Sequence, residues 1–244
     1  TDLAGNAGSA GSVTWSQASY NTVALYNFTS TSSVGNDSSL FPGAEHNNAS
    51  QTGTATPTFA TTGKFGTGGL FASGSSQFLV ALDNGSQDLL ANKMTIDAFV
   101  KLTSIPAYGV SYVIASKMGS TAGNYGWRLA LRRTSSSSTK LALSFSVALA
   151  GSTTTPTEKV STTFSFGTSA FNHIAVTWNA GSVQFFIYGT SYGSTTIGTA
   201  GSSKINATTA DLRIGADGMS PYSYFNGVID QLRLSQVVRW TSKF

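Results

Sequence analysis

Side chains that commonly do acid–base chemistry are sparse in this sequence. Its 244 residues hold ten Asp and Glu and two His. Glycoside hydrolysis needs two carboxyl groups beside the scissile bond, one as acid and the other as base or nucleophile. The two glutamates, Glu45 and Glu158, lie in unrelated segments rich in Ser, Thr and Asn. No predicted strand carries two acids two or four positions apart, so the sequence predicts that the protein is not an enzyme.

The histidines also argue against nucleophilic or metal-dependent catalysis. A serine hydrolase brings Ser, His and an acid together, but His46 and His173 are the only histidines and no G-x-S-x-G motif is present. Two histidines with few acids and no cysteine argue against a zinc site. His173 falls opposite Ile174 and Val176 in its predicted strand, which favours a hydrogen-bonded structural role.

Two aspartates are expected to differ in burial. Asp97 shares a polar strand face with Lys101, which predicts a solvated surface acid. Asp230 alternates instead with apolar neighbours such as Leu232, which predicts that it points to the apolar side. A buried carboxylate is costly unless it is ion-paired, metal-bound or hydrogen-bonded. Asp230 therefore needs a partner, and loop N–H groups or Arg213 could supply one.

Alternation of apolar and polar residues predicts strands along the chain, and no segment shows helical periodicity. The clearest alternating runs are 94–102, 126–132, 140–147, 174–178 and 183–187. The last two flank the turn Asn179-Ala180-Gly181-Ser182 and predict a β-hairpin. Many antiparallel strands without helices are typical of two sheets packed face to face.

Composition favours an all-β protein outside the cell or on a particle. Charged residues make up 10% of the chain, against about 25% in ordinary soluble domains. Ser, Thr, Asn and Gly must therefore provide solubility, and these residues suit turns better than helix interiors. The absence of cysteine removes disulfides and thiol chemistry. We expect an extracellular or virion-surface location.

Charge is distributed unevenly along the chain. Residues 1–92 contain one basic and five acidic residues, whereas residues 93–244 contain thirteen basic and five acidic residues. The longest basic run is Arg132-Arg133, whereas nucleic-acid binding needs a clustered basic footprint. No apolar run approaches the ~18 residues that span a bilayer. The sequence predicts neither nucleic-acid binding nor membrane insertion.

Residues 1–22 differ in composition from the rest. They are rich in Gly, Ala and Ser with one large anchor, Trp15. Such a segment cannot bury enough surface to fold alone, so we expect an arm or linker that lies on a neighbour and could join copies into a homo-oligomer. Residues 23–244 are expected to form one domain. Because the chain begins at Thr1 without a signal peptide, we expect a fragment, a processed form or one module of a longer protein.

Several segments resemble a known family. These are MTIDAFVKL (94–102), FNHIAVTWNAGSVQFFIYG (171–189) and LRIGADGMSPYSYFNGVIDQLRLSQVVRW (212–240). In order and spacing they resemble strands of the laminin-G-like, concanavalin A-like lectin/glucanase jelly rolls, in the form found in phage structural and bacterial surface proteins. VALYNFTSTSSVGNDSS (23–39) resembles the first strand of that family. The resemblance implies an antiparallel jelly-roll sandwich, a fold that hosts lectins, hydrolases, adhesins and structural modules.

The resemblance also implies a structural calcium ion, because related jelly rolls hold one between the last strand and the N-terminal loop. Calcium takes about six to eight oxygen ligands. Asp230 and Asp37 are the side chains that would ligate it, and Asn36 and Ser38 could supply further oxygens. The alternative is that hydrogen bonds or Arg213 alone hold Asp230.

Glycan recognition uses aromatic faces together with polar partners, usually on loops. The candidate carbohydrate-binding residues are the loop tyrosines Tyr192, Tyr222 and Tyr224, and Phe186 and Tyr188 on the non-core side of their strand. Further exposed tyrosines are expected at Tyr108, Tyr112 and Tyr125.

Three functions remain open. The first is a non-catalytic carbohydrate-binding or adhesion module of a phage or bacterial surface protein, with a cell-surface glycan as partner. The second is a structural module that decorates a virion and binds other coat or tail subunits through its N-terminal arm. The third is a glycoside hydrolase with an atypical site.

Overall fold

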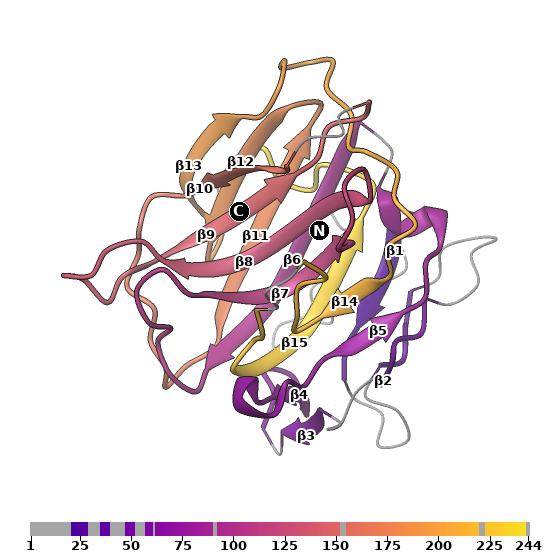
Figure 1. The fold of residues 1–244 in the computed structure, drawn as a ribbon. Coiled ribbons are helices and arrows are strands. Elements are labelled where there is room, and N and C mark those ends of the chain that lie inside the picture. The colour runs from indigo at the N-terminus through magenta and orange to yellow at the C-terminus, as the bar shows by residue number, and fades with distance from the viewer. Residues whose placement is uncertain are drawn as a thin grey trace, which may run out of the picture.

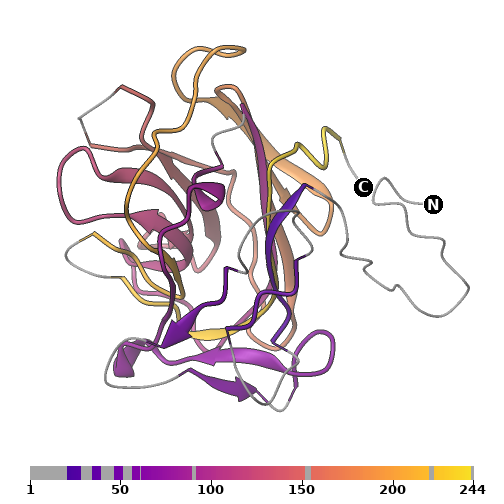
Figure 2. The same cartoon turned by 90° about the vertical axis from the view of Figure 1, so that its right-hand side faces the viewer.

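Strands from all parts of the chain form two antiparallel sheets that pack face to face (Figure 1). This computed structural model describes residues 21–28, 35–39, 47–51, 57–60, 62–89, 92–151, 155–219 and 223–242. Figure 2 shows the two sheets as layers seen from the side. The predicted all-β jelly-roll sandwich is confirmed.

The eight-stranded sheet forms one layer. Its order is β13 (Thr190–Thr196), β12 (Ser182–Ile187), β11 (Asn172–Asn179), β6 (Lys93–Leu102), β15 (Gly227–Ser235), β4 (Gly68–Phe71) and β3 (Thr58–Ala60), with β1 (Thr22–Tyr26) also paired to β15.

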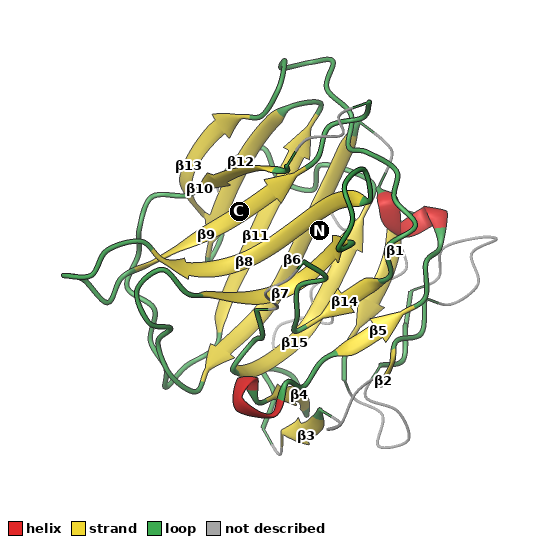
Figure 3. Cartoon of the chain, viewed as in Figure 1, coloured by secondary structure: helices red, strands yellow, loops and turns green. Residues whose placement is uncertain are grey.

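The seven-stranded sheet forms the other layer and faces the viewer in Figure 1. Its order is β10 (Thr157–Val160), β9 (Leu141–Val147), β8 (Tyr125–Arg133), β7 (Ser111–Met118), β14 (Leu212–Ile214), β5 (Leu79–Ala81) and β2 (Ser50–Gln51). Helical structure in the described residues is limited to two 3₁₀ turns, η1 (Ser73–Ser75) and η2 (Gly85–Asp88), visible in Figure 3. No described helix has the length and apolar character to cross a membrane.

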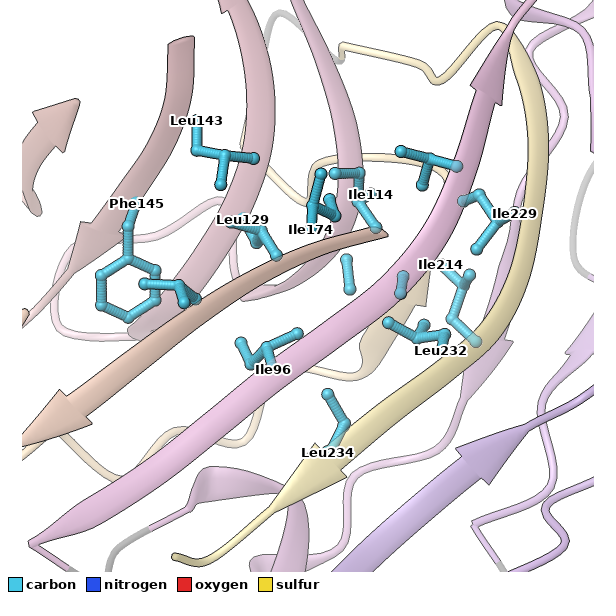
Figure 4. Packing of buried hydrophobic residues seen from close by; sticks show 14 of the residues in the cluster. Ile96, Ile114, Leu129, Leu143, Phe145, Ile174, Ile214, Ile229, Leu232 and Leu234 are labelled. Atoms are coloured by element: carbon cyan, nitrogen blue, oxygen red, sulfur yellow. The ribbon is translucent and has the colours of Figure 1, made fainter. Parts of the chain in front are cut away.

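The apolar faces that alternation predicts meet between the sheets. Figure 4 shows Ile96 and Ile174 of the eight-stranded sheet within the same cluster as Leu129, Leu143 and Phe145 of the seven-stranded sheet. All five side chains are fully buried, and burial of each contributes about 1.5–3 kcal/mol. This core fixes which side of each strand faces outward.

The predicted hairpin is confirmed between β11 and β12. Ala180 and Gly181 both have positive φ, 46° and 103°. A two-residue turn with two positive φ values matches the right-handed twist of the paired strands. Gly181 adopts this conformation without strain, whereas positive φ is unfavourable for Ala180. The Ala180 N–H donates to Asn92 O over 2.5 Å, which helps to hold it there.

A β-bulge in β15 overturns the predicted orientation of Asp230. Gln231 has φ 51°, and the pairing with β6 shifts between Asp230 and Arg233. Ile229 and Leu232 therefore both face the core. Asp230 lies on the outer face of the sheet, so the prediction that it shares the core face with Leu232 is wrong. The bulge inserts one residue, and this reverses the alternation that the prediction assumed.

Two sequence-based predictions fall outside the described residues. The proposed arm is described only at residues 21 and 22, and Tyr222 is not described. The division of the chain at residue 22 stays a prediction.

Candidate functional site

A row of polar side chains crosses the outer face of the seven-stranded sheet. Arg128 on β8 pairs with Ser146 on β9, and Ser146 pairs with Glu158 on β10. Directly opposed residues on one sheet face lie close enough for their side chains to interact. Because Trp127 and Leu129 of β8 occupy the core, the alternation of the strand turns Arg128 outward.

Glu158 and Arg128 are the centre of this network. Arg128 Nη2 donates to Glu158 Oε1 over 3.3 Å, and its Nη1 donates to Asp217 Oδ2 over 2.7 Å. Glu158 also accepts from Arg132 and from the Ser144 hydroxyl. One arginine thus joins two carboxylates that are far apart in the sequence, and strands β8, β9 and β10 hold Arg128, Ser144 and Glu158 in place.

The loop after β14 brings Asp217 and an aromatic ring to the same face. An isolated bridge pairs Ala216 with Tyr224, and the Asp217 N–H donates to Ser223 O over 3.0 Å. The Tyr224 ring lies 6.1 Å from Phe78, centroid to centroid. Asp217 and Tyr224 therefore border the polar row together.

Two neighbouring hollows lie over this row. Arg132, Glu158 and Gly109 line both hollows. The first, called here the Tyr108 hollow, measures about 490 Å³, and the second, called the Tyr224 hollow, measures about 690 Å³. Each combines fixed charged groups with an aromatic side chain.

Exposed apolar side chains rim the two hollows. Tyr108 is 60% exposed, and Val110 and Val160 are each 43% exposed. An aromatic or aliphatic surface beside fixed hydrogen-bonding groups is the usual composition of a small-ligand site. Sequence reasoning missed Arg128, Arg132 and Glu158, although the two arginines stand on the non-core face of the predicted strand 126–132. Glu158 gave no sequence signal, because its short strand follows a Ser/Thr-rich segment.

The structure separates the candidate carbohydrate-binding residues. Tyr224 lines the Tyr224 hollow. Tyr192, on β13 of the other sheet, is half-buried and packs on Phe164, with ring centroids 5.4 Å apart. Tyr192 is therefore remote from the hollows and acts as a packing residue at the sheet edge.

Phe186 and Tyr188 also belong to the eight-stranded side of the sandwich. Phe186 is fully buried, so the expectation that it lines a ligand surface is wrong. Tyr188 is 57% exposed, and its hydroxyl lies 2.7 Å from Phe171 O and 2.9 Å from Asn172 Oδ1. Tyr188 lines neither of the two hollows.

Asp97 is not the solvated surface acid that its polar strand face predicts. It is 2% exposed, and Arg233 binds it in a bidentate manner, with both N–O distances 3.0 Å. His173 Nε2 lies 3.5 Å from Asp97 Oδ2, in the structural role expected for this histidine. Burial acts to raise the pKa of Asp97, but the charge of Arg233 and the contact with His173 outweigh it and hold the pKa below its usual value.

The segment after β15 is the reason for this burial. Thr95 Oγ1 donates to Val237 O over 2.7 Å, so the chain crosses the outer face of the sheet. The Trp240 ring lies 5.8 Å from the His173 ring and 5.7 Å from the Arg233 guanidinium. Residues 236–240 thus cover a face that alternation alone predicts to be open.

The contacts of Asp37 do not fit a calcium ligand. Its Oδ1 accepts from the Leu25 and Ser39 N–H groups, each over 2.8 Å. Its Oδ2 accepts from the Asn47 N–H and lies within hydrogen-bond distance of the Ser39 hydroxyl, both 3.0 Å away. A carboxylate has about four acceptor positions, and protein donors occupy all of them. Asp37 therefore holds its loop against β1.

Asp230 is held by backbone N–H groups, as one of the alternatives expected. Its Oδ2 accepts from Lys64 and Phe65 over 2.8 and 2.9 Å, while its buried Oδ1 has no hydrogen-bond partner. Burial raises its pKa to about 6, although these hydrogen bonds and the nearby Gln231 lower it in part. Arg213 lies on β14 of the seven-stranded sheet, where its guanidinium stacks on the Phe78 ring. The proposed pairing of Asp230 with Arg213 is therefore wrong.

Asp37 and Asp230 share no hydrogen-bond partner, and the part of the chain that the structure describes contains no cluster of three or more acids and histidines. Calcium binding stays a prediction.

Comparison with known proteins identifies the family. The sequence pattern of the concanavalin A-like lectin/glucanases superfamily matches residues 73–241. This chain belongs to that superfamily. Curated protein sequences give no match.

Solved structures share the fold of this superfamily member. Domain 4 of AbnA, a GH43 extracellular arabinanase from Geobacillus stearothermophilus solved with arabinotriose, is 19% identical with a TM-score of 0.61 over 88% of this chain and 92% of that one. The binding domain of Paraclostridial Mosquitocidal Protein 1 is 13% identical, with a TM-score of 0.60 over 89% of this chain and 49% of that one. Botulinum neurotoxin type C, whose cell entry depends on two ganglioside molecules, is 14% identical, with a TM-score of 0.57 over 89% of this chain and 48% of that one. This chain spans about half of either toxin chain, and at these identities the likeness establishes the fold alone.

Proposed function

We propose that this domain is a non-catalytic carbohydrate-binding module whose site is the pair of hollows on the outer face of the seven-stranded sheet. The observation that carries the proposal is the combination of the fixed Arg128–Glu158–Arg132 row with the exposed ring of Tyr108. A sugar offers both hydroxyl groups and apolar C–H faces, and this surface provides a partner for each.

The ion pairs prepare the surface for a ligand. Strands β8 and β10 fix the backbone of Arg128 and Glu158, and their mutual contact restricts the side chains. Side chains that are ordered before binding lose less entropy when the ligand arrives. Sugar hydroxyls could then donate to Glu158 and accept from the arginines while a ring stacks on Tyr108.

The same contacts support binding rather than hydrolysis. Both oxygens of Glu158 accept from arginine or serine donors, and Asp217 Oδ1 lies 3.2 Å from both the Ser116 hydroxyl and the Met219 N–H. Asp217 Oδ2 is bound to Arg128. A hydrolase would need one of these carboxylates to reach the glycosidic oxygen and transfer a proton, whereas here each stays bound to the protein.

Similar folds in an arabinanase domain solved with arabinotriose and in a ganglioside-dependent toxin support a glycan as the ligand class. We propose an extracellular location on the same grounds. Attachment to a phage virion or a bacterial surface, and the alternative of a structural coat module, stay predictions.

Two exposed tyrosines provide a matched test of the site. Tyr108 is 60% exposed beside the hollows, and Tyr188 is 57% exposed on the other sheet. On a glycan array and in calorimetric titration with a glycan from its positive spots, Tyr108→Ala should weaken binding at least tenfold, and Tyr188→Ala should leave it unchanged. The opposite result would move the site to the eight-stranded sheet. Absence of binding to every glycan would overturn the proposed function, and release of reducing sugar from a bound glycan would overturn its non-catalytic character.

A further inference from the structure

The two hollows share a border on the outer face of the seven-stranded sheet. Arg132, Glu158 and Gly109 line both of them. Tyr108 and Tyr224, in contrast, each line one hollow only. Each hollow therefore has an aromatic side chain of its own, while the charged groups at the border are common to both.

Glu158 joins the charged groups of the two hollows. Its Oε1 accepts from Arg128 Nη2 over 3.3 Å, and its Oε2 accepts from Arg132 Nη1. Arg128 lines the Tyr224 hollow alone, whereas Arg132 lines both hollows. The carboxylate thus lies between two guanidinium groups at the border. These fixed groups offer hydrogen bonds to the part of a ligand that passes from one hollow to the other.

A tight turn at residues 107–110 also borders both hollows. The Val110 N–H donates to Ala107 O over 3.0 Å. Tyr108 lines one hollow and Val110 lines the other, with Gly109 between them. Gly109 has φ 78°, and a side chain added there would meet no protein atom within 4 Å. The border is therefore open at the one position of the turn that has no side chain.

We propose that the two hollows are adjacent subsites for one glycan chain, which passes from one to the other across Gly109. The ligand is then an oligosaccharide of at least two sugar units rather than a single sugar. This inference rests on the proposed function, because it specifies the length of the glycan that the module binds. The hollows measure about 490 and 690 Å³, and each by itself falls within the range of about 300–1,000 Å³ of small-ligand sites. A chain that occupies both gains contacts that one sugar unit cannot make.

Linked subsites predict a strong dependence of affinity on chain length. Once one sugar unit is bound, the next unit is held close to its own subsite, so its binding costs little further translational entropy. The probes are the strongest glycan of the array and its fragments of one, two and three sugar units. Affinity should rise at least tenfold from the one-unit fragment to the two-unit or three-unit fragment. NMR titration, which records weak binding, measures each affinity.

Gly109→Asn tests the crossing between the subsites. Asn adopts positive φ more readily than most other non-glycine residues, and its side chain would stand in open space at the border. This variant should remove most of the gain in affinity of the three-unit fragment over the one-unit fragment. Gly123→Asn is the matched control, because Gly123 has φ 83°, an added side chain there also meets no protein atom within 4 Å, and Gly123 lines neither hollow. The control should leave every affinity unchanged.

A second pair of variants tests the two subsites without changing the turn. Tyr108→Ala and Tyr224→Ala should each weaken binding of the three-unit fragment at least tenfold, and melting curves establish that all variants are folded. Equal affinity for the one-unit and three-unit fragments, or a loss in only one tyrosine variant, would overturn the two-subsite inference and leave the proposed function standing. An unchanged gain in folded Gly109→Asn would overturn the crossing at Gly109. Absence of binding to every glycan of the array would overturn the proposed function itself.

Discussion

The outer faces of the two sheets carry the same kind of ion pair in opposite surroundings. Asp97 and Arg233, on the eight-stranded sheet, have side chains 3% and 4% exposed. Glu158 and Arg132, on the seven-stranded sheet, have side chains 28% and 37% exposed. Residues 236–240 cover the first pair, and nothing among the described residues covers the second to the same extent. A charged pair on a sheet face therefore stabilises the fold where another segment of the chain covers it, and is available to a ligand where none does.

Removal of one acid from each pair should give the largest contrast. Asp97→Ala leaves Arg233 as an uncompensated buried charge, which should lower the free energy of unfolding by about 3–5 kcal/mol. Glu158→Ala leaves Arg132, whose side chain is 37% exposed, and Arg128, which is still paired with Asp217, and should cost about 1 kcal/mol or less. Urea denaturation measures both. Equal losses would mean that the two faces do not differ as their exposure indicates.

Asp230 extends the contrast to pH. Its pKa in the folded protein is about 6, against an ordinary value of 3.8. Because the pKa is higher in the folded protein than in the unfolded chain, the folded state takes up the proton first as pH falls. The free energy of unfolding should therefore rise as pH falls from about 7 to 4. This added stability should be lost as pH rises through 6. A shift of about 2 units corresponds to about 3 kcal/mol as an upper estimate.

Asp230→Asn is the control for this pH effect, because the amide stays neutral and keeps one oxygen for the Lys64 and Phe65 N–H groups. The free energy of unfolding of Asp230→Asn relative to wild type should be more favourable at pH 7, where the wild-type carboxylate is ionised, than at pH 4.5, where it is protonated. Parallel pH profiles of wild type and variant would contradict the assignment. The Asp97 pair does not interfere in this window, because its pKa is lowered and its contribution is lost only at more acidic pH.

Chelation should have the smallest effect. Because protein donors occupy the oxygens of Asp37, we expect the melting temperature to stay the same when EDTA is added. Differential scanning calorimetry with and without added calcium measures this. A fall in melting temperature that the Asp230→Asn variant no longer shows would instead support the calcium ion that the family resemblance implies.

The sequence by itself determined the strands, the core and the family. Alternation of Trp127 and Leu129 with Arg128 depends on the two-residue repeat of a strand, which holds wherever no bulge interrupts the strand. The turn at Gly181 could likewise be predicted locally, since glycine adopts positive φ without strain. Such features could be predicted because neighbours in sequence decide them.

Only the tertiary structure decided the burial of the acids and the composition of the site. Asp97 is covered by residues about 140 positions later, and the bulge at Gln231 moved Asp230 to the other face of its sheet. Arg128, Glu158 and Asp217 come from three separate segments and meet because the order of strands places them there. The physical reason is that alternation assigns a side chain to one of two faces, whereas the solvent exposure and partners of that face depend on segments that arrive from elsewhere in the chain.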